Sequence, residues 1–279
     1  MKNIFKFLFN GLRVYRISGW VKNLGLVVIA LTFTDLELFH VKTVYILLIT
    51  AATYCYAFSL NDMFDNIIEN EKNYFSKIHS PNVKIAYVIL PLFIILLSFP
   101  LLFSSTFFLM TYLCILLTSL YSVPPFRFRN RPFWDVLFNS LSLTLMSFQV
   151  FFIADSINFL GIILASLFGL YFGYYELIHQ LSHLKIDLRT GRKTTAFVVG
   201  TSRIKKLLIY FSALIALSFS FLLFYLPEYA PWFVVAILLN IIRAIQVFNA
   251  SNSSNFNYLR NGLLGLEGLL YLLLNLALL

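Results

Sequence analysis

Three carboxylates occur close together in a chain that holds only 12 acidic residues. Asp62, Asp65 and Glu69 stand at offsets of zero, three and seven residues, at the end of a long apolar segment. On a helix, side chains at these offsets lie within about 60° of one another. Carboxylates at a membrane are costly unless a cation neutralises them, and oxygen ligands suit Mg²⁺, which commonly shares its coordination shell with phosphate. The spacing therefore predicts a membrane enzyme that acts on a phosphorylated or diphosphorylated substrate.

A second set of polar residues ends a later apolar segment. On a helix its members form one stripe about 100° wide. They are Glu176, His179, Gln180, His183 and Asp187. Basic residues follow directly, among them Arg189, Arg192 and Lys193. Two polar stripes at the same membrane face can face each other across a cavity in a helical bundle.

The spacing of His179 and His183 also fits a pair of Zn²⁺ or iron ligands. Membrane di-iron enzymes need several histidine boxes, however, whereas this chain has four histidines in all. We therefore favour a hydrogen-bonding role for His179 over a role as a transition-metal ligand.

The composition indicates an integral membrane protein. Of the 279 residues, 60% are hydrophobic and 12% are charged, and the mean hydropathy is +0.83. Soluble globular domains are rarely so apolar. We expect an all-α fold, a polytopic membrane helical bundle that forms a single domain over residues 1–279. Residues 1–22 mix apolar and basic side chains, which favours an interfacial amphipathic segment over a signal peptide.

Apolar runs long enough to span a bilayer recur along the chain. They predict about nine transmembrane helices around a central cavity. The predicted spans are residues 23–39, 43–61, 84–103, 106–122, 134–154, 158–179, 206–226, 231–248 and 259–278.

The distribution of Lys and Arg predicts the orientation of these spans. With the N-terminus inside, 18 of the 21 basic residues fall in inner segments, namely 1–22, 62–84, 123–132 and 183–206. This positive-inside bias predicts a cytoplasmic N-terminus and puts both acidic motifs at the cytoplasmic face. The net charge of +9 is then explained by topology and by contact with the lipid bilayer, so no nucleic-acid partner is expected.

Four stretches of the chain resemble, in order, motifs of the UbiA superfamily of intramembrane prenyltransferases. Asn61-Asp62-x-x-Asp65-x-x-x-Glu69 is similar to the first signature, NDxxDxxxD. Glu176 to Thr195 resembles the second region, in which DxxxD precedes Gly-x-Lys-Thr. Tyr121 to Arg131 resembles the YSxPPxRxK loop, with Arg129 at the Lys position, and Arg16 to Asn23 resembles the N-terminal segment. The resemblance runs from about residue 13 to residue 200.

The resemblance implies that the acidic motifs hold Mg²⁺ on a prenyl diphosphate. It assigns one Mg²⁺ to Asp62, Asp65 and Glu69, with Asp187 helping from the other side. Asn61 would orient the substrate or a ligand. The candidates for contact with the diphosphate are Lys77, Arg127, Arg129 and Lys193, although positive-inside anchoring would equally explain Lys77, Arg127 and Arg129.

The chain departs from the family pattern at two positions. Glu69 replaces the third Asp, which keeps the charge and adds a methylene group. His183 stands where the first Asp of DxxxD is expected, which removes a carboxylate from the second metal site. Histidine is a poor ligand for Mg²⁺, but it can act as an acid or base or bond to phosphate. The candidate catalytic residues are therefore Asp62, Asp65, Asp187 and His183.

The predicted function is transfer of a polyprenyl group from a prenyl diphosphate to a small acceptor within the membrane, for example an aromatic quinone precursor. Two alternatives use the same motifs: phosphoribosyl-type transfer onto polyprenyl phosphate, and a catalytically inactive lipid-binding member of the family. A transporter is disfavoured because the polar residues gather at one membrane face. The motifs leave open the acceptor, the donor chain length and the oligomeric state.

Overall fold

The computed structural model describes residues 10–17, 24–34, 36–37, 40–69, 73–97, 105–154 and 159–260. Within these residues the regular structure is entirely helical, which confirms the predicted fold class. The longer helices are α3 (Leu24–Thr32), α4 (Val41–Ile68), α5 (Pro81–Leu97), α6 (Ser105–Ser122), α7 (Trp134–Ile153), α8 (Phe159–Thr190), α10 (Thr201–Tyr225) and α11 (Ala230–Asn249). The short elements are η2 (Tyr74–Lys77), η4 (Phe128–Asn130), α9 (Thr195–Val199), η5 (Pro227–Tyr229) and α12 (Ser253–Tyr258).

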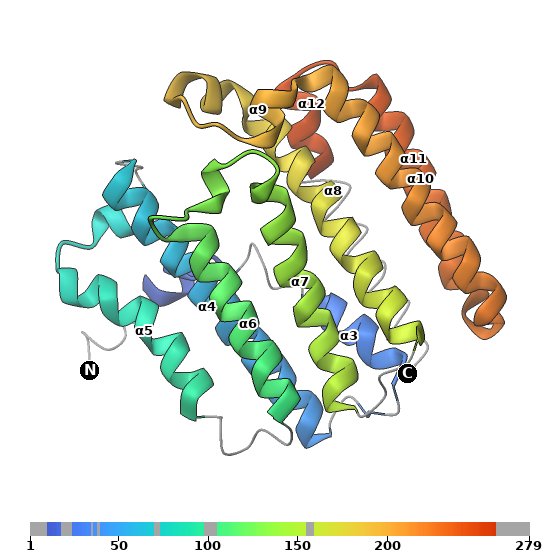
Figure 1. Ribbon diagram of the computed structural model, residues 1–279, viewed down its shortest axis with the longest axis horizontal. Coiled ribbons are helices and arrows are strands. Elements are labelled where there is room, and N and C mark those ends of the chain that lie inside the picture. The colour runs from blue at the N-terminus through green and yellow to red at the C-terminus, as the bar shows by residue number, and fades with distance from the viewer. Residues whose placement is uncertain are drawn as a thin grey trace.

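The long helices pack as a bundle of neighbours along the chain (Figure 1). Helix α7 lies between α6 and α8, and α4 packs against both α5 and α6. Helices α10 and α11 form a pair that contacts α8 through α10, while α3 crosses behind α7 and α8 (Figure 1). The C-terminal ends of α4, α6 and α8 lie at the same end of the bundle, at the top of Figure 1. The connections after these helices are therefore neighbours in space.

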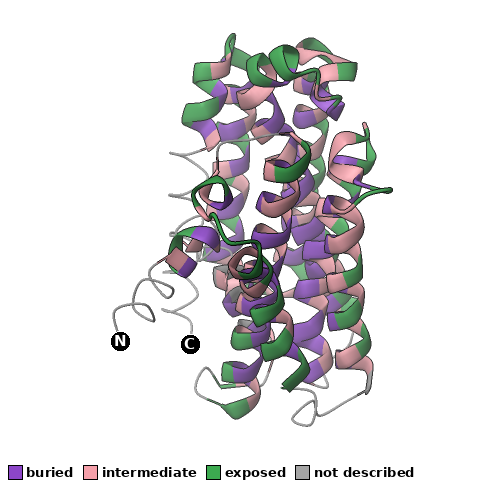
Figure 2. Cartoon of the chain, turned by 90° about the vertical axis from the view of Figure 1, so that its left-hand side faces the viewer, coloured by how far each residue is buried: buried purple, intermediate pink, exposed green. Residues whose placement is uncertain are grey.

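The outer faces of the bundle are apolar. Five helical segments are long and apolar enough to cross a membrane, and α5 and α6 are shorter apolar helices. Figure 2 shows buried residues along the facing sides of the helices and exposed residues on their outer turns. Many of the exposed side chains are large and hydrophobic, such as Phe224, which is 86% exposed. Lipid rather than water is the medium that suits such a surface.

Eight of the nine predicted spans overlap helices of the structure, but the first, 23–39, is helical only over Leu24–Thr32, which is too short to cross a membrane as a helix. The ninth, 259–278, lies outside the described residues from residue 261 onward. Residues 1–9 and 18–22 of the predicted interfacial segment also lie outside them, whereas residues 10–17 are largely helical.

Helices α4 and α8 continue well beyond their predicted spans. Hydropathy limited the predictions to 43–61 and 158–179, but backbone hydrogen bonding continues to Ile68 and Thr190. At 1.5 Å per residue, 28 and 32 residues give lengths of about 42 and 48 Å, against a hydrocarbon core of about 30 Å. The extra turns are long enough to reach the membrane interface, and they carry both polar motifs.

Two glycines of α8 allow close contact with α7. A Cβ atom added at Gly169 would lie 1.9 Å from Oγ1 of Thr144, and one added at Gly173 would lie 2.7 Å from Oγ of Ser140. Small residues let membrane helices approach until their backbones nearly touch. This contact fixes the position of α8, and with it the polar stripe, relative to α7.

Gly169→Ala should therefore lower the stability of the bundle by about 1–3 kcal/mol, as overpacked cores do. Thermal unfolding in detergent measures the loss as a lower midpoint. Adding Thr144→Ala removes the hydroxyl that the new methyl group would meet, so the double variant should recover most of the loss. A single variant as stable as the wild type would show that the two helices separate freely.

Candidate active site

The first acidic motif occupies the last turns of α4, where its three carboxylates point to one side as the spacing predicts. Asp62 and Asp65 are 1% and 2% exposed, and Glu69 is the C-cap residue of the helix. Asn61 lies on the same face and donates a hydrogen bond from Nδ2 to Oδ2 of Asp65 at 3.3 Å. Buried carboxylates need cationic partners, and the neighbouring connections supply them.

Two arginines of the α6–α7 connection reach into this motif. Arg127 Nη2 donates to Oδ1 of Asp65 at 3.0 Å and to Oε1 of Glu69 at 2.7 Å. Arg129 Nη1 donates to Oδ1 of Asn61 at 2.6 Å and pairs with Asp65. Arg127 adopts a left-handed backbone conformation, with φ of 39°, just before η4. Arg127 and Arg129, both predicted as candidates for diphosphate contact, therefore lie beside the acidic motif.

Two further arginines come from distant parts of the chain. Arg16 donates two hydrogen bonds to Asp62, one from Nε to Oδ2 at 3.0 Å and one from Nη2 to Oδ1. Arg192, in the turn after α8, pairs with Oε2 of Glu69. Three carboxylates of the first motif thus face four guanidinium groups.

These contacts change the pKa values of two groups outside the membrane-spanning helices, Glu69 and Arg129. Burial acts to raise the pKa of Glu69, but hydrogen bonds from Asn130 and Arg192 and the charges of Arg192 and Arg129 lower the pKa below its ordinary value. Burial acts to lower the pKa of Arg129, but Asp65 and other negative groups raise it. Glu69 is therefore ionised and Arg129 protonated at neutral pH.

At two places, side-chain oxygen atoms from two residues of the motif contact the same guanidinium nitrogen. Nη2 of Arg127 bridges Asp65 and Glu69, and Nη1 of Arg129 bridges Asn61 and Asp65. Oxygen atoms that contact a shared positive group form a ligand set that suits Mg²⁺. Within the described ranges, no three acidic, His or Cys side chains are arranged to hold a metal ion, and the carboxylates of the motif are paired with arginines. Binding a metal here requires the arginines to move to another anion.

The second carboxylate region lies opposite, on α8. Asp187 is buried and accepts a hydrogen bond from Oγ1 of Thr194 at 3.2 Å. It interacts electrostatically with Arg192 and, on the other helix, with Glu69. The two polar motifs therefore meet through Arg192, which follows the second polar stripe in the sequence but was not among the predicted site residues.

A buried network holds the turn that carries Arg192. Asp135 at the start of α7 accepts hydrogen bonds from the backbone nitrogen of Thr195 at 2.8 Å and from Nε2 of Gln180 at 2.9 Å, and its other oxygen accepts from the Thr195 hydroxyl. Oε1 of Gln180 accepts from the backbone nitrogen of Ala196 at 3.0 Å. These bonds tie α7, α8 and α9 together beside the site.

The comparison with protein families matches residues 23–258 to the UbiA prenyltransferase family. The chain belongs to this family. No curated protein matches the sequence.

Solved structures of UbiA proteins share the fold over nearly the whole chain. A UbiA homolog from Archaeoglobus fulgidus bound to GPP and Mg²⁺ has a TM-score of 0.74 at 20% identity, over 96% of this chain and 99% of the homolog. The homolog bound to DMAPP and Mg²⁺ has a TM-score of 0.78 at 18% identity, over 96% and 98%. A structure of digeranylgeranylglyceryl phosphate synthase has a TM-score of 0.71 at 14% identity, over 98% of each chain.

His183, where this UbiA protein departs from the family pattern, points toward an arginine. Arg260, just after α12, contacts Nε2 of His183 at 2.6 Å and Nδ1 of His179 at 3.0 Å. The hydrogen-bonding role expected for His179 agrees with this contact. Glu176, deeper in the same stripe, accepts a hydrogen bond from Asn139 of α7 at 2.8 Å.

The structure does not bring Lys77 and Lys193 into the cluster. Lys77 lines a separate cavity of about 200 Å³ with Asn10 and Arg13, and its ammonium lies 4.9 Å from the centre of the Tyr74 ring. Lys193 is exposed at the surface beside Arg192. Both residues remain candidates for contact with a substrate that extends beyond the acidic motif.

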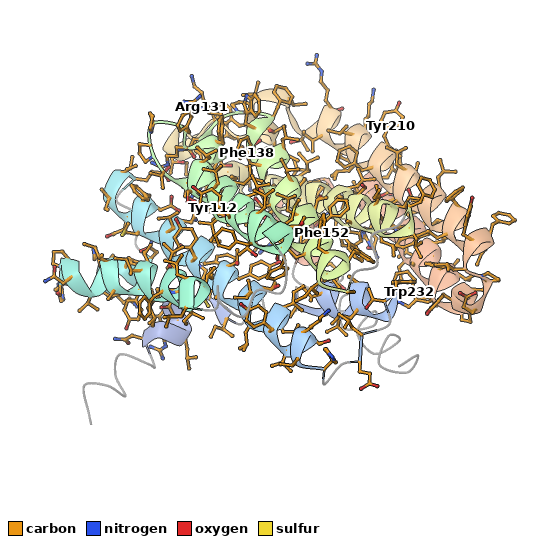
Figure 3. The ribbon with its side chains drawn as sticks, turned by 60° about the horizontal axis from the view of Figure 1, so that its bottom comes forward. Tyr112, Arg131, Phe138, Phe152, Tyr210 and Trp232 are labelled. Carbon is orange, nitrogen blue, oxygen red and sulfur yellow. The ribbon has the colours of Figure 1, made fainter. Side chains whose placement is uncertain are left out.

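Three arginines of the region were not predicted as site residues, namely Arg16, Arg192 and Arg260. Arg16 and Arg192 lie in the stretches that resemble the family motifs, so their basic side chains were a usable signal. Arg131 is a contrast within the α6–α7 connection. It is exposed at the outer edge of the molecule (Figure 3), where it donates to the backbone oxygen of Pro125 at 2.9 Å.

Proposed function

We propose that this protein transfers a prenyl group from a prenyl diphosphate to a small acceptor within the membrane, with Mg²⁺ as the metal. One observation carries the proposal: oxygen ligands and four arginines meet at one end of a membrane helical bundle. The carboxylates suit a metal ion, and the arginines suit a diphosphate. The UbiA homolog solved with GPP or DMAPP and Mg²⁺ supports the same choice of donor and metal.

Asp62, Asp65 and Glu69 would hold Mg²⁺, with Asn61 beside them and Asp187 facing them from α8. When bound, Mg²⁺ would neutralise the negative charge that develops on the departing diphosphate.

The arginines exchange partners in the proposed cycle. In the structure, Arg127, Arg129 and Arg192 neutralise the carboxylates and keep the buried charges paired. With metal and donor present, their planar donors turn to the diphosphate oxygens, which they can bind in pairs. The cluster then stabilises the leaving group while the bond between the allylic carbon and oxygen breaks. Charge stabilisation of this kind is commonly the largest part of catalysis.

The proposed acceptor captures the allylic cation in the apolar interior of the bundle, and an aromatic acceptor then loses the proton of the attacked ring carbon to the released diphosphate or to water. Exclusion of water there protects the cation from hydrolysis. Quinone-precursor aromatic rings are one acceptor class that suits such a site, because an electron-rich ring reacts readily with a carbocation.

The proposal includes an orientation in the membrane. The connections that carry Arg127 and Arg192 lie at the same end of the bundle as the C-terminal end of α4. Since basic residues concentrate in these connections, the positive-inside bias favours a cytoplasmic position for this end. Water-soluble diphosphate would then leave directly into the cytoplasm.

Product analysis tests the proposed function. The purified protein in proteoliposomes receives Mg²⁺, a labelled prenyl diphosphate and a pool of aromatic acceptors. We expect a prenylated acceptor and released diphosphate, both abolished by a metal chelator. A parallel reaction contains phosphoribosyl diphosphate and a polyprenyl phosphate. Product in that reaction alone would replace the proposal by phosphoribosyl-type transfer, and product in neither, from folded protein, would indicate an inactive lipid-binding member.

A further inference from the structure

A second cavity, of about 200 Å³, lies between the helical residues 10–14 and η2. We call it the N-terminal cavity; its lining residues are Asn10, Arg13, Val14, Tyr74, Lys77 and Ile78. Val14 is fully buried, and Tyr74 and Ile78 pack in the same apolar cluster. Packing therefore holds the apolar part of the lining in place.

The polar part of the lining brings together two cations from distant parts of the chain. The guanidinium carbon of Arg13 lies 5.6 Å from the centre of the Tyr74 ring, and Nζ of Lys77 lies 4.9 Å from the same centre. Asn10 adds an amide group. Among the described residues that line the cavity, none is acidic. The cavity therefore offers hydrogen-bond donors and positive charge to a ligand.

This combination of donors suits a phosphate group. Guanidinium and ammonium groups are the side chains that most often bind phosphate oxygens, and both do so with strong, charge-assisted hydrogen bonds. A guanidinium group has five N–H donors and an ammonium group has three. Arg13 and Lys77 can therefore keep their contacts with the Tyr74 ring, and other contacts as well, while they bind an anion in the cavity.

The position of the cavity indicates a lipid as the source of the phosphate. Helix α5 begins soon after Lys77, and its Ile85 and Ile89 are 48% and 53% exposed on one face of the helix. The buried Tyr87 of α5 contacts Tyr15, with ring centres 5.9 Å apart, so the N-terminal residues pack beside α5. The acyl chains of a phospholipid can lie along the apolar face of α5 while its phosphate enters the cavity.

Both segments that form the cavity also contact the first acid of the acidic motif. Asn73, the N-cap residue of η2, donates from Nδ2 to the backbone oxygen of Asp62 at 2.6 Å. Arg16, one helical turn after Arg13, pairs with the Asp62 carboxylate. A ligand that bonds to both Arg13 and Lys77 would hold these two segments together.

We propose that the N-terminal cavity binds the phosphate group of an anionic phospholipid, with Arg13 and Lys77 as its ligands. Basic groups beside a membrane helix attract anionic headgroups, and a cavity adds a defined position for one of them. The proposal assigns Lys77, which the structure keeps out of the acidic cluster, to this lipid. It does not depend on the proposed function, because neither a donor nor a metal takes part.

Lipid binding to the purified full chain tests the inference without relying on turnover. The chain in neutral detergent is titrated with phosphatidylglycerol or with phosphatidylcholine of the same acyl chains, and native mass spectrometry measures the bound lipid. We expect the first phosphatidylglycerol to bind at least about tenfold more tightly than phosphatidylcholine, because each basic group near the headgroups contributes about fivefold in affinity.

The variants remove two cations at the cavity and, as a matched control, two cations elsewhere. Arg13→Gln with Lys77→Gln should lower the affinity for phosphatidylglycerol at least about tenfold and leave that for phosphatidylcholine unchanged. Arg203→Gln with Lys206→Gln makes the same chemical changes at exposed positions at the start of α10 and should match the wild type.

A single variant keeps the test valid if the cavity double variant does not fold. Lys77→Gln, at an exposed position on η2, should lower the affinity for phosphatidylglycerol about fivefold. Lys77→Arg keeps the charge and the donors, so it should retain most of the affinity. Equal losses in the cavity and control double variants, or no loss in the cavity variants, would overturn the inference.

Inorganic phosphate distinguishes a lipid from a soluble ligand. It lacks acyl chains, so at the concentration of the lipid it should displace little bound phosphatidylglycerol. Displacement at equal concentration would overturn the lipid assignment in favour of a soluble phosphate compound. Each of these outcomes leaves the proposed function standing.

Discussion

Asp65→Asn is expected to lower the rate of prenyl transfer by at least about a hundredfold, the order of effect seen when one electrostatic group is removed from an active site. Asp65 is the central acid of the cluster, because it pairs with both Arg127 and Arg129 and accepts a bond from Asn61. Asparagine keeps the shape and removes the charge that a divalent ion needs. The measurement is product formed per folded molecule, with binding of Mn²⁺ recorded in parallel.

The matched control is Glu228→Gln, the same chemical change at an exposed position in η5, near the end of the bundle away from the acidic motif. Its rate should equal that of the wild type. Because Asp65→Asn also leaves the guanidinium groups of Arg127 and Arg129 less well paired, the variant should unfold at a lower temperature without ligand. Normal turnover by folded Asp65→Asn protein would contradict the assignment of the acidic motif to the metal.

Arg127→Ala should weaken the apparent affinity for the prenyl diphosphate about ten- to a hundredfold, since charged hydrogen bonds contribute about 1.5–3 kcal/mol each. Arg127 is 8% exposed and bridges Asp65 and Glu69, so its guanidinium lies where a diphosphate bound to the same metal would sit. Arg127→Lys should fall between the alanine variant and the wild type, because lysine keeps the charge and loses the planar pair of donors.

Arg131→Ala provides the comparison within the same connection. Arg131 lies four residues further on, exposed at the outer edge of the molecule (Figure 3), and its guanidinium lies 5.4 Å from the centre of the Phe128 ring. The initial rate as a function of donor concentration measures the effect, and the Arg131 variant should follow the wild-type curve. Equal losses in both variants would mean that the loop acts through its overall charge rather than through Arg127.

The ion pairs of the cluster also explain how the protein can keep so many charges buried. Each acid of the first motif has at least one arginine partner, and Asp65 and Glu69 have two. Pairing of this kind costs little when both partners remain together and much when one is removed. A substrate that carries both a cation and a polyanion can replace both partners at once, which is the property of a diphosphate bound with its metal.

Local sequence determined much of this protein. Apolar runs predicted eight helices that the structure contains, because a bilayer core requires long apolar helices with internally satisfied backbones. The offsets of Asp62, Asp65 and Glu69 predicted a shared face, since helical periodicity depends only on position in the chain. The hydropathy pattern predicted ends for α4 and α8 that come too early. Backbone hydrogen bonding continues into the polar turns beyond the last apolar side chains.

Tertiary structure alone decided which basic residue meets which acid. Arg127 and Arg131 stand in the same connection, and Arg192 and Lys193 are adjacent, yet one of each pair faces the acidic motif and the other faces outward. Composition and spacing do not distinguish the members of such pairs, because their orientation depends on loop conformation and on buried bonds such as those of Asp135. The contact of Arg260 with His183 joins residues 77 positions apart, and it exists only because α12 packs against α8.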